Sequence, residues 1–106
     1  MINQIDRIRQ MEILLDEATS VIDDVSMAIE DGKQTSEIID KFNSIQDKIA
    51  TLSAYYEGNE WREDYEADCD NLLPPCLKRG VLSEDAIYDL LTDNDILKEQ
   101  IENRLD

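Results

Sequence analysis

The chain has 106 residues, and its 26 acidic and 10 basic side chains give a formal charge of −16. An apolar fraction of 42% is too high for a disordered chain, and three glycines and two prolines are too few for a collagen-like or linker-like one. A chain of this length forms a single domain over residues 1–106. Its apolar runs fall far below the roughly 18 residues of a membrane span, and no signal-peptide pattern is present. We therefore expect a cytoplasmic protein with no membrane partner.

The first helix is predicted from a periodic stripe of apolar residues. The spacing alternates between three and four residues, which places every member on one helix face. The stripe consists of Ile8, Met11, Leu15, Ala18, Ile22, Val25 and Ile29. Gly32 follows directly, and glycine is the usual residue where a helix ends in a left-handed conformation. We therefore predict one long helix that ends near Asp31.

A second helix is predicted after a short turn, with Thr35 or Ser36 as its N-terminal cap. Its apolar stripe has spacings of four and three residues and consists of Ile38, Phe42, Ile45, Ile49, Leu52 and Tyr56. A short connection that contains glycine favours an antiparallel hairpin of two helices, which we place at residues 2–56.

A third helix is predicted to begin at Asn59 as its cap and to run to about Leu72. Trp61, Tyr65 and Leu72 are expected to point inward because they are spaced by four and seven residues. The two prolines at 74 and 75 cannot continue a helix, so residues 73–80 are expected to form a turn or irregular segment.

One or two short helices are predicted at the C-terminal end. Ser83 is the expected cap of the first, over Glu84 to Leu91, with acids in its first turn. Thr92 and Asp95 resemble a capping box, which predicts either a fifth short helix or a continuation of the preceding one. That helix carries Ile96, Leu97, Ile101 and Leu105. The sequence thus predicts an all-α bundle of four to five helices, with a long N-terminal hairpin and shorter C-terminal helices in residues 57–106.

Acidic residues are densest in residues 57–76, which hold seven acids and one base. Glu60, Asp64 and Asp68 lie one helical turn apart, where like charges repel. One interpretation is that nearby cations neutralise this row. The available cations are Arg62, Lys78 and Arg79. An arginine would then make paired hydrogen bonds with Asp64 or Asp68, and residues 55–91 would form a self-contained acid–base cluster around Trp61.

The other interpretation is that the same region binds a partner. Four of the six aromatic residues fall within residues 55–65, and interfaces are enriched in Tyr, Trp and Arg. The aromatic rings would anchor a basic partner and the carboxylates would steer it. The candidate interaction surface consists of Tyr56, Trp61, Asp64, Tyr65, Asp68, Lys78 and Arg79. The sequence leaves both interpretations open.

Several motifs in residues 55–91 are similar to the signature of a known family. They are YY at 55–56, EWR at 60–62, DYEAD at 64–68, LP at 73–74 and LKRGVLSEDAIYDLL at 77–91. With these motifs the chain resembles domain-of-unknown-function family 4298, a small bacterial family, over nearly its whole length. That family has no assigned activity, so the resemblance implies a bacterial protein and supplies no mechanism.

Most catalytic chemistry is excluded by composition. The chain has no histidine, so it lacks Ser-His-Asp and Cys-His arrangements and an imidazole base. Cys69 and Cys76 are expected to be reduced thiols, and we expect no metal and no cofactor. A magnesium-dependent all-α nucleotide hydrolase is an enzymatic alternative, because residues 57–66 contain the pattern ExxE. The ExxD motif that should follow on a neighbouring helix is missing.

The sequence therefore favours a non-enzymatic protein-binding or regulatory module with an unknown, basic partner. A charge of −16 opposes direct binding of nucleic acid. The same charge makes an acidic DNA mimic, which inhibits a basic DNA-binding protein, the main alternative. Self-association stays open because the apolar stripes of the two long helices are wide.

Overall fold

Five α-helices and one short 3₁₀-helix are the regular structure of residues 3–83 and 85–104, which are the residues that the computed structural model describes. No β-strand occurs in these residues, so the predicted all-α fold is confirmed. The helices are α1 (Gln4–Glu30), α2 (Ser36–Ser44), α3 (Gln46–Glu57), α4 (Asn59–Cys69), the 3₁₀-helix η1 (Gly80–Leu82) and α5 (Ala86–Arg104).

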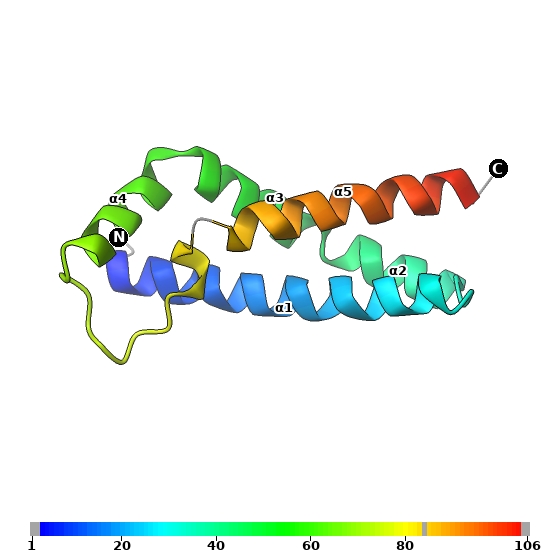
Figure 1. The fold of residues 1–106 in the computed structure, drawn as a ribbon, viewed down its shortest axis with the longest axis horizontal. Helices are drawn as coiled ribbons and strands as arrows, with labels where there is room; N and C mark the ends of the chain where they lie inside the picture. Colours follow the sequence, from blue (N-terminus) through cyan, green and yellow to red (C-terminus); the bar gives the residue numbers. More distant parts are fainter. Residues whose placement is uncertain (1–2, 84, 105–106) are drawn as a thin grey trace.

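The helices form an elongated bundle with extents of 49 × 24 × 24 Å. Figure 1 shows α1 and α5 running in the same direction, while α2 and α3 run back along α1. Helix α4 closes one end of the bundle, and residues 70–79 loop out from that end before η1 leads into α5 (Figure 1). Helix α1 packs against α2, α3, α5 and η1, so it is the central element of the fold.

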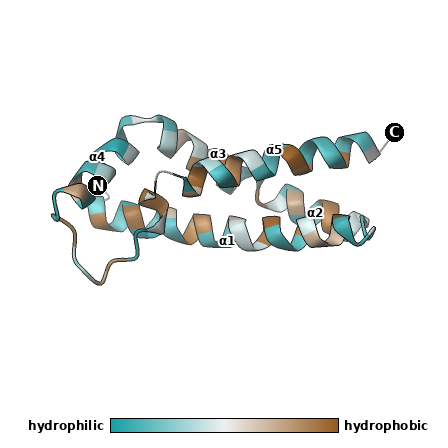
Figure 2. Ribbon diagram, viewed as in Figure 1, coloured by the Kyte–Doolittle hydropathy of each residue, from teal (hydrophilic) through white to brown (hydrophobic). Residues whose placement is uncertain are grey.

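The apolar stripe predicted for the first helix forms much of the core. Its buried members are Ile8, Leu15, Ala18, Ile22, Val25 and Ile29. Helix α5 adds a second stripe with the same spacing, in which Ile87, Leu90, Leu97 and Ile101 are buried. Figure 2 shows hydrophobic and hydrophilic residues alternating along both helices. In the described residues, no helix combines the length and the apolar character needed to cross a membrane.

The end of α1 is as predicted. Gly32 has a φ angle of 73°, its N–H donates to the carbonyl of Ile29 at 3.1 Å, and the N–H of Lys33 donates to that of Ala28 at 2.7 Å. These two bonds satisfy carbonyl groups that have no partner within the helix.

Helix α4 ends earlier than predicted. Asn71 adopts a φ angle of 57°, and the N–H of Leu72 donates to the carbonyl of Ala67 at 2.9 Å, the same termination as in α1. The chain turns away at this point, so the side chain of Leu72 is 73% exposed and its predicted inward position is wrong. Leu73 is buried instead.

The second predicted helix is interrupted at Ile45, where α2 ends and α3 begins. The apolar stripe continues across the interruption, because Phe42, Ile45 and Ile49 are all buried. The side-chain amide of Gln46 donates to the carbonyl of Phe42 at 3.0 Å and to Oδ1 of Asn94 on α5 at 2.9 Å. These contacts stabilise an interruption that the spacing of apolar residues does not reveal.

The junction between α3 and α4 also differs from the prediction. Gly58, not Asn59, is the cap residue, and it is the only residue between the two helices. Its N–H donates to the carbonyls of Ala54 and Tyr55, and a Cβ atom at this position would lie 3.1 Å from the Ala54 oxygen. At the end of α3 the chain buries Tyr55 and leaves Tyr56, the predicted core residue, partly buried.

The two short C-terminal helices are one continuous helix, α5. Of the two predicted alternatives, the structure shows the continuation, and Thr92 lies inside α5 and is not an N-terminal cap. The apolar stripe of α5 includes one polar residue, Asn94. Its side chain is buried and exchanges amide hydrogen bonds with Gln46. The predicted first turn includes Glu84 and the predicted stripe ends at Leu105, and both residues lie outside the described ones.

The Gln46–Asn94 pair predicts a specific stability loss. We expect Asn94→Ala to lower the free energy of unfolding by about 1–2 kcal/mol, because Gln46 then keeps a part-buried amide without its partner. Denaturant unfolding measures this value. Asn103→Ala, at an exposed site on the same helix, is the control and should change stability by less than about 0.5 kcal/mol. Equal losses in the two variants would contradict the assignment.

Candidate functional site

A buried carboxylate, Asp64, lies where α1, α3 and α4 meet. Its side chain is 0% exposed. Oδ2 accepts hydrogen bonds from Nε of Arg7 at 3.0 Å and from the hydroxyl of Tyr55 at 2.6 Å. Oδ1 accepts from Nη2 of Arg7 at 2.5 Å and from the amide of Gln4 at 3.0 Å. Four donors thus occupy the lone-pair positions of the carboxylate, and the charge is fully compensated.

Arg7 connects this buried carboxylate to the surface acids of α4. Its Nη1 donates to Glu60 at 2.9 Å, and its Nη2 lies 3.7 Å from a carboxylate oxygen of Glu63. Hydrogen bonds to Asp64 raise the pKa of the Arg7 guanidinium above its usual value. The flat guanidinium can serve three carboxylates because its five N–H groups point in fixed directions, which a lysine cannot reproduce.

Tyr55 carries its hydroxyl into the same cluster. Burial raises the pKa of this hydroxyl well above its ordinary value, and the hydrogen bond that it donates to Asp64 raises the pKa further. The hydroxyl therefore stays protonated and serves as a donor to the carboxylate.

This cluster answers part of the question that the sequence left open. An arginine does make paired hydrogen bonds with Asp64, but it is Arg7 of α1 and not a residue of the segment 55–91. The prediction of a self-contained cluster in that segment is therefore wrong. Arg7, Gln4 and the hydroxyl of Tyr55 were missed because apolar spacing carries no information about which polar side chains meet in the fold.

Arg79, one of the cations that the sequence offered for this row of acids, forms an ion pair with Asp68 through one hydrogen bond. Nη1 of Arg79 donates to Oδ1 of Asp68 at 2.5 Å, and the same guanidinium donates to the carbonyls of Pro74 at 2.6 Å and Leu77 at 3.2 Å. Arg79 therefore fixes the irregular segment 70–79 against α4.

Trp61 lies between two tyrosine rings. The ring of Tyr65 stacks on it, with centroids 5.0 Å apart, and the ring of Tyr56 meets it edge-on at 5.1 Å. The indole N–H donates to the carbonyl of Val81 at 3.0 Å, while the N–H of Val81 donates to Glu12 of α1 at 2.7 Å. The backbone of η1 is thus held from both sides, by α4 and by α1.

The predicted interaction surface is divided by these contacts. The structure brings Tyr56, Trp61 and Tyr65 together as a partly buried aromatic group. Asp64 faces the interior, and Asp68 and Arg79 pair with each other. Lys78 is exposed on the irregular segment.

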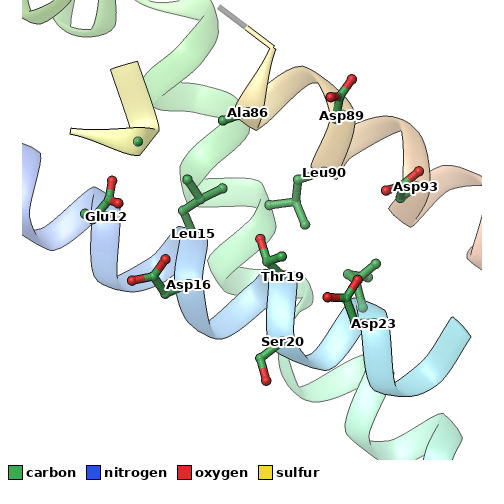
Figure 3. A pocket seen from close by; sticks show the side chains of 12 residues that line it. Glu12, Leu15, Asp16, Thr19, Ser20, Asp23, Ala86, Asp89, Leu90 and Asp93 are labelled. Atoms are coloured by element: carbon green, nitrogen blue, oxygen red, sulfur yellow. The ribbon is translucent and has the colours of Figure 1, made fainter. Parts of the chain in front are cut away.

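A different feature, a groove between α1 and α5, was not singled out from the sequence. It is a hollow of about 640 Å³, continued by a second hollow of about 400 Å³ that shares Ile22, Asp23 and Asp93 with it. Figure 3 shows Leu15 and Leu90 lying between the helices. The labelled carboxylates on either side belong to Glu12, Asp16 and Asp23 of α1 and to Asp89 and Asp93 of α5 (Figure 3). We call this feature the α1–α5 groove.

Counter-charges are distributed unevenly around α1. On the side that faces α2 and α3, Lys41 pairs with Asp24 at 2.8 Å and Lys48 pairs with Glu17. Among the described residues that line the α1–α5 groove there is no lysine or arginine. The groove is therefore a surface of one charge sign.

Metal-ligating side chains and cysteines are not clustered in the described part of the chain. No group of three or more Cys, Asp or Glu side chains there is placed to hold a metal ion. Cys69 and Cys76 are free and exposed.

These features define an acidic all-α bundle with a buried arginine–carboxylate centre and an open groove. A family model described as "Domain of unknown function (DUF4298)" matches residues 28–103, and the chain belongs to this family. The match includes Asp64, Asp68 and Arg79 and begins after Arg7. No curated protein and no solved structure matches the chain.

The buried cluster predicts a large effect of a small change. We expect Asp64→Asn to lower the free energy of unfolding by about 3 kcal/mol, because it removes the charge that compensates a largely buried guanidinium. Urea unfolding measures this value. Glu66→Gln, at an exposed acid of the same helix, should cost less than about 0.5 kcal/mol. A loss as small as that of Glu66→Gln in the Asp64 variant would show that the cluster is not stabilising.

The raised pKa of Tyr55 predicts a dependence on pH. Its folded-state pKa lies above the unfolded value of about 10, so its stabilising contribution is fully present below pH 10 and declines as the pH rises toward the folded-state pKa. We expect the stability difference between the wild type and Tyr55→Phe to be largest at pH 8 and to shrink between pH 10 and 12.

Unfolding measured at several pH values tests this expectation. Tyr88→Phe is the matched control, because the side chain of Tyr88 is 59% exposed. A stability difference for Tyr55→Phe that stays constant up to pH 12 would contradict the assigned role of the Tyr55 hydroxyl.

Proposed function

We propose that this protein is a non-enzymatic binding module of the bacterial cytoplasm that contacts a basic partner protein through the α1–α5 groove. The observation that carries the proposal is the acid on both sides of an accessible groove whose described lining residues include no lysine or arginine. Elsewhere the same fold places cations beside its acids, as in the pairs Arg7–Asp64, Arg79–Asp68 and Lys41–Asp24. Acids facing one another across a groove repel in the free protein, and a cationic partner relieves this repulsion.

The cluster around Asp64 differs from the groove in how its carboxylate is used. Asp64 has no exposed surface and four donors, so its carboxylate is occupied by the protein itself. The groove acids Asp16, Asp23 and Asp93 are exposed and can reach a partner. Binding is therefore assigned to the groove and stability to the motif around Asp64.

Removing the charges of the groove acids is expected to weaken partner binding without lowering the stability of the fold. We expect a triple variant to lose capture of its partner in roughly physiological salt while its free energy of unfolding stays equal or rises slightly, because repulsion is relieved. The three changes are Asp16→Asn, Asp23→Asn and Asp93→Asn. Pull-down at two salt concentrations and urea unfolding measure the two effects.

The matched control removes the same number of charges from exposed acids outside the groove. Its changes are Asp40→Asn, Glu66→Gln and Asp95→Asn. The control should keep the partner. Equal losses in both triple variants would mean that net charge alone attracts basic proteins, and the proposed module would be rejected.

The aromatic group is a second candidate surface. Trp61 and Tyr65 are partly buried and stacked, with part of each ring open to solvent. If the groove variant still captures the partner and the Tyr65→Ala variant does not, the aromatic group and not the groove is the binding surface. Competition by duplex DNA for either surface would identify the protein as a DNA mimic.

A further inference from the structure

The α1–α5 groove has the length and direction of a helix-binding site. On α1 it extends from Glu12 to Glu30, which corresponds to about 27 Å at the rise of an α-helix. On α5 it extends from Ala86 to Gln100, about 21 Å. Both helices run in the same direction (Figure 1), and the two hollows follow one another along them.

The acids along α1 follow a helical repeat. Glu12, Asp16, Asp23 and Glu30 are separated by four, seven and seven residues, so they form one row along the groove. Glu12 accepts the N–H of Val81, so the exposed acids of this row are Asp16, Asp23 and Glu30. Asp89 and Asp93 lie one turn apart on α5 and form the opposite row. A helical partner repeats its side chains with the same period, so its cations can meet successive acids of a row.

The floor between the two rows is narrow and of mixed polarity, because Thr19 and Ser26 line the hollows together with apolar residues. Leu15, Ile22 and Leu90 line it and are nearly buried, so they offer only a thin strip of apolar surface. More apolar surface is available at one end, where Ile96 is 50% exposed and lines the second hollow. Met27 of α1 is 63% exposed and lies one turn beyond Asp23. The partner therefore needs small or medium apolar side chains in a single stripe, with a larger one near that end.

From this geometry we propose that the groove receives a single amphipathic α-helix of the partner, with lysine or arginine on both flanks of a narrow apolar stripe. The inference rests on the proposed function and specifies its ligand. A partner helix of about 14 to 18 residues matches the two lengths of the groove. Helices commonly pack in this way in the groove between two others.

Charge excludes the other occupants. A second copy of the chain adds another −16 and would bring acids against acids. Nucleic acids and anionic lipid surfaces also carry negative charge and are repelled by both rows. A cationic helix is the occupant whose chemistry complements both the rows and the floor.

The test uses fluorescein-labelled peptides of about 18 residues and the intact protein. One peptide places Leu and Ala in a helical stripe flanked by Lys and Arg. A second has the same composition in an order that destroys the stripe. Fluorescence anisotropy at roughly 50, 150 and 500 mM salt gives the affinities.

We expect the striped peptide to bind at least about tenfold more tightly than the scrambled one at 150 mM salt, with affinity falling as salt rises. The groove variant with Asp16→Asn, Asp23→Asn and Asp93→Asn should weaken binding by about tenfold or more. The control variant with Asp40→Asn, Glu66→Gln and Asp95→Asn should change it by less than about twofold. Circular dichroism should show the striped peptide gaining helix in the complex.

Two results overturn the inference. Equal binding of the two peptides would show that only net positive charge is recognised. Groove-dependent capture of a partner protein without binding of the striped peptide would leave the protein-binding function standing and reject the helical ligand. Loss of groove dependence in both assays would reject the proposed function itself.

Discussion

The arrangement of the bundle depends on the compensation of one buried charge. Moving a carboxylate out of water is costly, and Asp64 of α4 is stabilised only because donors from two other helices converge on it. Arg7 and Gln4 come from α1, and Tyr55 comes from α3, so the requirement for compensation fixes how α4 closes the end of the bundle. The apolar stripes determine which faces of the helices meet, but apolar contacts are not directional. The hydrogen bonds to Asp64 are directional, so they fix the orientation of α4 relative to α1 and α3.

This compensation also explains how the acid of the chain is used. The fold of a protein with a charge of −16 must keep like charges apart or pair them. Three arginine or lysine contacts tie α1 to α4, α2 and α3, and Arg79 ties the irregular segment to α4. None of these four ion pairs involves a residue of α5. The cations of these pairs neutralise acids in other parts of the molecule, and the acids that line the α1–α5 groove have no lysine or arginine among the described residues beside them.

The sequence predicted the helical faces well and the polar contacts poorly. The spacing of Ile8 to Ile29 and the glycine at 32 gave α1 and its end correctly, because both are local properties. The capping-box pattern at Thr92 and Asp95 left the continuity of α5 open, and the buried pair of Asn94 with Gln46 could not be predicted from that pattern. The Arg79–Asp68 pair was predictable from a nearby turn. Arg7 lies 57 residues from Asp64, and no local pattern indicates such a contact. The acids of α5 could not be placed beside those of α1 either, because the spacing of residues within one helix does not show which helix packs next to it.

The contacts of η1 and α5 hold the C-terminal part of the chain in place independently of the loop that precedes it. Val81 is fastened to Glu12 and Trp61, and Asn94 to Gln46, so the C-terminal part of the chain is attached to the remainder by contacts as well as by the peptide bond. Pro75 and Cys76 are both exposed at the outer part of the loop. A protein nicked between them is expected to persist as a complex of two fragments, and the fragments, produced separately, should reassemble. The connection itself is then dispensable to the architecture, and foreign sequence can be inserted there without displacing α5 from α1.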